Sequence, residues 1–76
     1  MEGELQRIVG RNLRQIRLDR GYSQEAFADY MGVHRTYMGA VERGERNLTL
    51  QTLERIADFL EIDPRELLNA DMTMSG

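Results

Sequence analysis

The sequence contains no cysteine, one proline and a single histidine, His34, among its 76 residues. Without cysteine the chain cannot form disulfides, thiolate metal sites or cysteine nucleophiles. One histidine also excludes a histidine-rich zinc or catalytic cluster. No run approaches the roughly 18 consecutive apolar residues of a membrane span, and residues 1–10 lack the basic-then-apolar pattern of a signal peptide. We therefore expect a cytoplasmic protein with no membrane partner, no metal and no cofactor.

Lysine is absent as well: all ten basic residues are arginine, against thirteen acidic residues, and the formal net charge is −3. The charge is unevenly distributed, because residues 1–47 carry eight arginines and seven acids whereas residues 48–76 carry two arginines and six acids. This asymmetry favours one face suited to phosphate and another kept away from it. Arginine without lysine fits fork-like recognition of phosphate or guanine, although a GC-rich coding sequence gives the same bias without any function.

The length of 76 residues allows one small domain at most. We assign residues 1–76 to a single domain with an ordered core over about 4–70. A chain this short buries only about 60–65% of the surface that its unfolded form exposes, so it is marginally stable when alone. With no disulfide to stabilise it, the domain is a good candidate for a homodimer.

Apolar residues recur at spacings of three and four along most of the chain, and no window alternates with period two. The first stripe predicts a helix over about 4–19 and consists of Leu5, Ile8, Val9, Leu13 and Ile16. Three more helices are predicted over about 24–31, 35–43 and 50–60, bounded by Gly21, Ser23, Gly32, His34, Gly44 and Thr49. Residues 63–66 (DPRE) begin a short fifth helix with a pattern close to a capping box. The predicted fold class is all-α.

The segment 24–43 has the steric pattern of two helices joined by a tight turn. Ala28 allows the helices to approach closely, and Gly32 tolerates the left-handed conformation of the turn. Apolar residues at helical spacing face inward from both helices: Phe27, Met31, Val33, Met38 and Val41. These features predict a helix-turn-helix with 35–43 as its recognition helix. An ordinary αα-hairpin needs the same small residues, so this pattern alone leaves both interpretations open.

Residues 21–28 (GYSQEAFA) resemble the G-x-S/T-Q-E-x-L-A start of the XRE family, the lambda-repressor-like helix-turn-helix domains. Phe27 stands where that family usually has leucine. Residues 41–44 (VERG) are similar to the I-E-R/N-G end of its recognition helix. The resemblance covers about 5–68 and implies a compact five-helix domain that binds an operator as a dimer. Within the family, stretches over 35–49 are most similar to the controller proteins of restriction–modification systems.

We expect the exposed side of the recognition helix to contact DNA. Its first turn reaches base edges in the major groove, where Arg35 can bond guanine O6 and N7 together and Thr36 offers a hydroxyl or a methyl group. Arg46, in the following loop, is the third predicted base contact. The predicted backbone contacts are Ser23, Gln24, Tyr37 and Arg43. Gln24 lies at a helix N-terminus suited to phosphate. The alternative for Arg35 is a solvated surface arginine, and for Tyr37 a packing role.

The resemblance also implies residues with structural roles. It pairs Arg17 with Glu42 in a partly buried ion pair that braces the recognition helix instead of contacting DNA. The second half has more apolar residues than one small core needs, so part of them is assigned to a dimer interface: Phe59, Ile62, Leu67, Leu68 and Met72. The alternative is that all five close the core. A dimer would place two recognition helices one turn of DNA apart, roughly 34 Å.

Taken together, these patterns favour a sequence-specific transcription regulator that binds a (pseudo)palindromic operator as a homodimer and associates with the bacterial nucleoid. An autoregulatory controller of a restriction–modification system is one such protein. The alternative is an antitoxin or adaptor module that uses the same fold to bind a protein partner, which the acidic pI of about 5.0 favours. We expect neither a small-molecule ligand nor an enzyme, because the chain has no glycine-rich phosphate loop and is too short to enclose a cleft.

Overall fold

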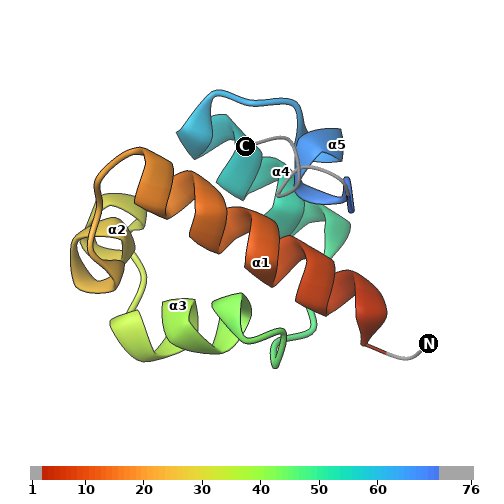
Figure 1. Ribbon diagram of the computed structural model, residues 1–76, viewed down its shortest axis with the longest axis horizontal. Coiled ribbons are helices and arrows are strands. Elements are labelled where there is room, and N and C mark those ends of the chain that lie inside the picture. The colour runs from red at the N-terminus through yellow and green to blue at the C-terminus, as the bar shows by residue number, and fades with distance from the viewer. Residues whose placement is uncertain (1–2, 71–76) are drawn as a thin grey trace.

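Five helices, and no other regular elements, are present over residues 3–70, the part of the chain that the computed structural model describes (Figure 1). They are α1 (Glu4–Asp19), α2 (Gln24–Met31), α3 (Arg35–Glu42), α4 (Leu50–Leu60) and α5 (Pro64–Leu67). The all-α prediction is confirmed, and α1, α2 and α4 have the predicted bounds. Helix α3 ends one residue earlier than predicted, because the chain enters a left-handed turn at Gly44, where φ is 76°.

Side-chain caps mark where α2, α3, α4 and α5 begin. Oγ of Ser23 and Oγ1 of Thr49 each accept a hydrogen bond from the backbone amide three residues later, at 3.1 and 3.0 Å. Before α3, Nδ1 of His34 accepts the amide two residues later at 3.1 Å, so an imidazole takes a place more often filled by serine, threonine or aspartate. Asp63 and Glu66 form a capping box at α5. Each cap acts on its own helix, so short-range sequence patterns suffice to predict it.

Helix α1 runs through the middle of the molecule, with α3 on one side and α4 and α5 on the other (Figure 1). It packs against α3 and α5, while α2 packs against α3 and α4 packs against α5. The core draws on every helix and consists of Val9, Leu13, Ile16, Phe27, Ala28, Met31, Met38, Val41, Leu53, Ile56, Ala57, Leu60 and Leu67. The α2–α3 pair is therefore positioned mainly by its contact with α1.

Leu67 belongs to this core, which corrects its predicted place at a dimer interface. Its side chain is fully buried within the protomer. The end of α5 is held against α1 by Asn12, whose Nδ2 donates to the backbone oxygens of Leu67 and Asn69, both at 2.9 Å. These bonds satisfy carbonyl groups that a helix end leaves free, and they fix α5 with Leu67 facing inward. Met72, predicted at the same interface, lies outside the described residues.

Candidate DNA-binding surface

Helices α2 and α3 are joined by the tight turn that the sequence predicts. Gly32 adopts a left-handed conformation with φ of 73°, and the amide of Val33 donates to the carbonyl of Ala28 at 2.9 Å. Phe27 and Ala28 are buried and bring α2 into the core beside α3. The two helices form a helix-turn-helix, with α3 on the opposite side of α1 from α4 and α5 (Figure 1).

A glycine in the middle of α1 allows α3 to approach closely. Gly10 is buried, and a methyl group added there would collide with the carbonyl oxygens of Val41 and Glu42 on α3. Glycine inside a helix costs about 1 kcal/mol relative to alanine, so an interior glycine is itself a sign of a close contact. Our sequence interpretation did not use that sign, and Gly10 is a structural residue that it missed.

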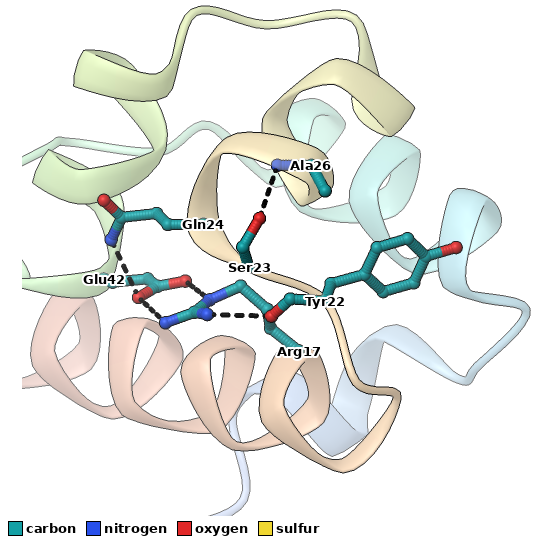
Figure 2. Close-up of polar contacts among 6 residues, drawn as sticks. All are labelled: Arg17, Tyr22, Ser23, Gln24, Ala26 and Glu42. Atoms are coloured by element: carbon teal, nitrogen blue, oxygen red, sulfur yellow. Dashed lines mark hydrogen bonds and ion pairs between the residues drawn. The ribbon is translucent and has the colours of Figure 1, made fainter.

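A buried polar cluster joins the C-terminal end of α3 to α1 and α2 (Figure 2). Nε of Arg17 donates to Oε2 of Glu42 at 2.7 Å, and Nη2 of Arg17 donates to Oε1 at 3.1 Å. The two side chains are only 9% and 4% exposed. Arg17 also donates to the carbonyl of Tyr22 at 3.0 Å, and Gln24 donates to Glu42 at 3.2 Å. The expected ion pair is thus present, and the hydrogen bonds around it connect α1, α2 and α3.

The structure gives Ser23 and Gln24 partners within the protein. Gln24 directs its side-chain Nε2 towards Glu42, and Ser23 uses its hydroxyl oxygen as the N-cap of α2 (Figure 2). Glu42 needs the amide because a buried carboxylate is costly unless donors surround it. A phosphate contact at this end of α2 therefore depends first on the backbone amides of Gln24 and Glu25, because those of Ala26 and Phe27 donate to Ser23.

The first turn of α3 is exposed, with Arg35 and Thr36 both at the surface. Arg35 does not extend freely into solvent. Its Nη1 lies 3.2 Å from Oε2 of Glu25 on α2, and the two side chains are 67% and 68% exposed. The sequence interpretation did not find Glu25, because the contact joins two helices ten residues apart and leaves no periodic signal.

Two further arginines follow α3, and each already contacts another side chain. The guanidinium of Arg46 lies over the ring of Tyr37, 4.9 Å from its centroid, in the geometry of a cation–π contact. Tyr37 is half-buried and packs against the core, so the packing alternative for its ring is realised. Nε of Arg43 lies 3.1 Å from Oε2 of Glu45. That hydrogen bond and the charge of Glu45 raise the pKa of Arg43 above its ordinary value.

Over residues 3–70 no group of three or more histidine, aspartate or glutamate side chains is placed to hold a metal ion. No helix in this range is long and apolar enough to cross a membrane. The exposed groups of the α2–α3 surface include arginine forks, hydroxyl groups and backbone amides, which are donors that proteins use toward phosphate and base edges.

The fold and this surface together define a helix-turn-helix DNA-binding domain. The helix-turn-helix family model matches residues 13–67, and the chain belongs to that family. The controller protein C.BamHI of Bacillus amyloliquefaciens is 39% identical over 77 residues, covering 100% of this chain and 93% of the relative. C.SmaI of Serratia marcescens is 43% identical over 65 residues, covering 86% of this chain and 77% of the relative.

Solved structures show the same likeness. The restriction–modification controller protein C.AhdI of Aeromonas hydrophila has a TM-score of 0.71 and 44% identity, covering 82% of this chain and 94% of that one. A hypothetical transcription factor from Neisseria has a TM-score of 0.82 and 33% identity, covering 99% and 86%. The protein is a DNA-binding transcription regulator of the XRE type with a lambda-repressor-like fold, and it is similar to restriction–modification controllers.

Proposed function

We propose that this protein binds a (pseudo)palindromic operator as a homodimer and inserts the first turn of α3 into the major groove. One observation carries the proposal: α3 is fixed at one end and exposed at the other. Glu42 is locked to α1 by a buried ion pair, whereas Arg35 and Thr36 are at the surface. A helix supported in this way presents its side chains in a defined orientation. Similarity to named control proteins supports a role as an autoregulatory controller of a restriction–modification system.

The base contacts are assigned to Arg35, Thr36 and Arg46. Arg35 bonds guanine O6 and N7 together, a contact worth about 1–3 kcal/mol of discrimination against another base. Thr36 contacts a neighbouring base through its hydroxyl or methyl group. Arg46 leaves the ring of Tyr37 and reaches a base or a groove edge beside the recognition helix.

The phosphate contacts are assigned to the two ends of the helix-turn-helix. Arg43 lies just after α3, and the hydroxyl of Tyr37 can donate to a phosphate while its ring stays packed. At the start of α2, the backbone amides of Gln24 and Glu25 supply donors, with Ser23 holding the helix end in place. These contacts position the protein on the duplex, while the base contacts specify the sequence.

The dimer surface is assigned to an apolar groove of about 220 Å³ where α1 and α4 begin. Leu5, Leu50 and Leu68 line it and are 61%, 78% and 37% exposed. Apolar side chains gathered in this way mark interaction sites on soluble proteins. Asn47, which follows α3, also lines the groove, so the proposed dimer surface adjoins the loop after the recognition helix.

Of the residues predicted for this interface that the structure describes, Leu68 alone lines the groove. Ile62 is partly buried and packs against the protomer core. Phe59 lies near the other end of α4, where its ring is 5.9 Å from that of Tyr30 on α2. Phe59 and Tyr30 therefore form a separate exposed apolar site, and we leave them outside the dimer surface.

The function is tested by the affinity of the protein for DNA upstream of its own gene, measured by fluorescence anisotropy at several salt concentrations. We expect tight, salt-sensitive binding that Arg35→Ala weakens by about 1–3 kcal/mol per half-site. Arg65→Ala is the matched control, since it removes the same charge from an 88% exposed side chain on α5. Equal affinity of the wild-type protein for upstream and random DNA would contradict the proposal.

A further inference from the structure

We propose that Glu25 is a specificity-determining residue, which holds the guanidinium of Arg35 until a guanine displaces it. The inference rests on the proposed function, because it assumes that Arg35 contacts a base. It concerns a residue that does not itself need to touch DNA. Glu25 acts by holding Arg35 in an ion pair that must break before the arginine can contact a base.

The geometry places the pair at the surface between the two helices. Glu25 lies in the first turn of α2 and Arg35 in the first turn of α3, with Nη1 of the arginine 3.2 Å from Oε2 of the glutamate. The two residues line a shallow pocket together with Asp29, Val33 and His34. Asp29 is a second acid on the same side, so the environment of Arg35 in the free protein is acidic.

The ion pair contributes little to folding, since exposed pairs of this kind are largely solvated. Its effect belongs to binding. A guanine offers two acceptors, O6 and N7, to the arginine fork, and so it replaces the carboxylate with equal or better geometry. At a base pair without those acceptors Arg35 stays paired with Glu25 and makes no DNA contact. Release of Arg35 is therefore favourable only at a guanine, and Glu25 keeps the arginine from contacting other sequences.

Without the carboxylate, Arg35 would be free to contact a phosphate at any sequence. Glu25→Gln is then expected to raise affinity for all DNA, because one negative charge is removed from the DNA-facing surface. Affinity for duplexes that lack the guanine should rise more than affinity for the operator. The ratio of the two affinities should fall by about two- to fivefold, the range that exposed ion pairs contribute.

The chain offers a matched control in the second exposed pair. Arg43 and Glu45 lie 3.1 Å apart with side chains 60% and 58% exposed, close to the values for Arg35 and Glu25. Glu45→Gln changes the net charge by the same amount and also frees an arginine, but that arginine lies after α3 and is assigned to phosphate. We expect Glu45→Gln to raise both affinities alike and to leave their ratio unchanged.

The experiment starts from a duplex that the wild-type protein selects from a random library. Its guanine contacts are located by methylation interference. In a second duplex, adenine replaces the guanine whose interference disappears with Arg35→Ala. Dissociation constants for both duplexes are measured by anisotropy for the wild type, Glu25→Gln, Glu45→Gln, Arg35→Ala and the double variant Glu25→Gln/Arg35→Ala. Thermal melts check that each variant is folded.

The proposal predicts a reduced ratio in Glu25→Gln, an unchanged ratio in Glu45→Gln, and no further change of the ratio by Glu25→Gln once Arg35 is alanine. If Glu25→Gln and Glu45→Gln behave alike while Arg35→Ala loses discrimination, the role of Glu25 is wrong and the proposed function stands. If Arg35→Ala keeps full discrimination, both the role of Glu25 and the assignment of Arg35 are overturned.

Discussion

At the scale of single residues, the two ends of α3 have opposite properties. Glu42 is almost fully buried and held by three donors from Arg17 and Gln24. Arg35 is two-thirds exposed and held by one exposed carboxylate. Burying an ion pair costs solvation energy that its mutual attraction only offsets, but removing one partner leaves the other charge buried and uncompensated. Glu42 is therefore important for folding, whereas Arg35 is available for binding.

Glu42→Ala should lower the free energy of unfolding by about 3–5 kcal/mol, because the charge of Arg17 is then buried without a partner. Arg35→Ala should change it by at most about 1 kcal/mol, as for other exposed pairs. Thermal denaturation followed by circular dichroism compares the two. The assignment of structural and binding roles would be reversed if Arg35→Ala were the more destabilising change.

At the scale of elements, α5 is a helix of four residues that begins at a capping box formed by the carboxylates of Asp63 and Glu66. Hydrogen bonds from the side chain and the backbone of Arg65 lower the pKa of Asp63 from 3.8 to about 2. A lowered pKa in the folded state stabilises the fold above the ordinary value, and that stabilisation is lost as the pH falls. Between pH 4 and pH 2 the cap of α5 should therefore weaken.

An NMR titration of the Asp63 carboxyl measures this directly. We expect a midpoint near 2 in the wild type. In Arg65→Ala it should return towards 3.8, because the side-chain hydrogen bond from Arg65, the largest cause of the lowered pKa, is removed. Asp63→Asn should make the stability of α5 less sensitive to pH over that interval. A wild-type midpoint at 3.8 would show that the contact with Arg65 does not persist in solution.

The contact between α1 and α3 depends on the absence of a side chain at Gly10. Gly10→Ala should destabilise the fold by about 1–3 kcal/mol, as overpacking does, even though alanine favours helix formation. Urea denaturation provides the measurement. Arg14→Ala, at an exposed position of the same helix, is the control and should be close to neutral. Equal stability of the two variants would mean that α1 and α3 approach less closely than described.

The helices were predictable because their signals are local. Ser23 and Thr49 cap the helix that follows directly, and the apolar spacing of three and four needs only neighbouring residues. The contacts between helices were harder to predict from the sequence. Asn12 and Leu67 are 55 residues apart, so no short pattern shows that α5 turns inward. The same holds for Glu25, which contacts an arginine of another helix. Gly10 differs, because a glycine inside a helix is a local sign of close packing that the sequence interpretation did not use.

At the scale of the whole molecule, the unequal distribution of charge agrees with the arrangement of the helices. The helix-turn-helix lies on one side of α1 and the acidic second half forms α4 and α5 on the other (Figure 1). The side proposed to face DNA carries Arg35, Arg43 and Arg46 but also Glu25, Asp29 and Glu45, so it has no net positive charge. DNA binding there requires that Arg35 and Arg43 leave their carboxylate partners. Net charge alone would have favoured the protein-binding alternative.

Dimerisation can be tested with one substitution at each apolar site. Leu50→Glu places a charge in the groove between α1 and α4 at a 78% exposed position, so it should fold normally and dissociate the proposed dimer. Phe59→Glu, at the site shared with Tyr30, should leave the dimer intact. Sedimentation equilibrium over a range of concentrations distinguishes them. A monomer from Phe59→Glu and a dimer from Leu50→Glu would move the interface to the other end of α4.

The central claim is that two copies of α3 contact guanines in two half-sites. Methylation interference on the DNA upstream of the gene tests it most directly, since a methyl group on guanine N7 blocks the bond from Arg35. We predict two groups of interfering guanines one helical turn apart, about 10 base pairs, that disappear with Arg35→Ala. Interference that persists in Arg35→Ala, or no guanine interference beneath a specific complex, would contradict the claim.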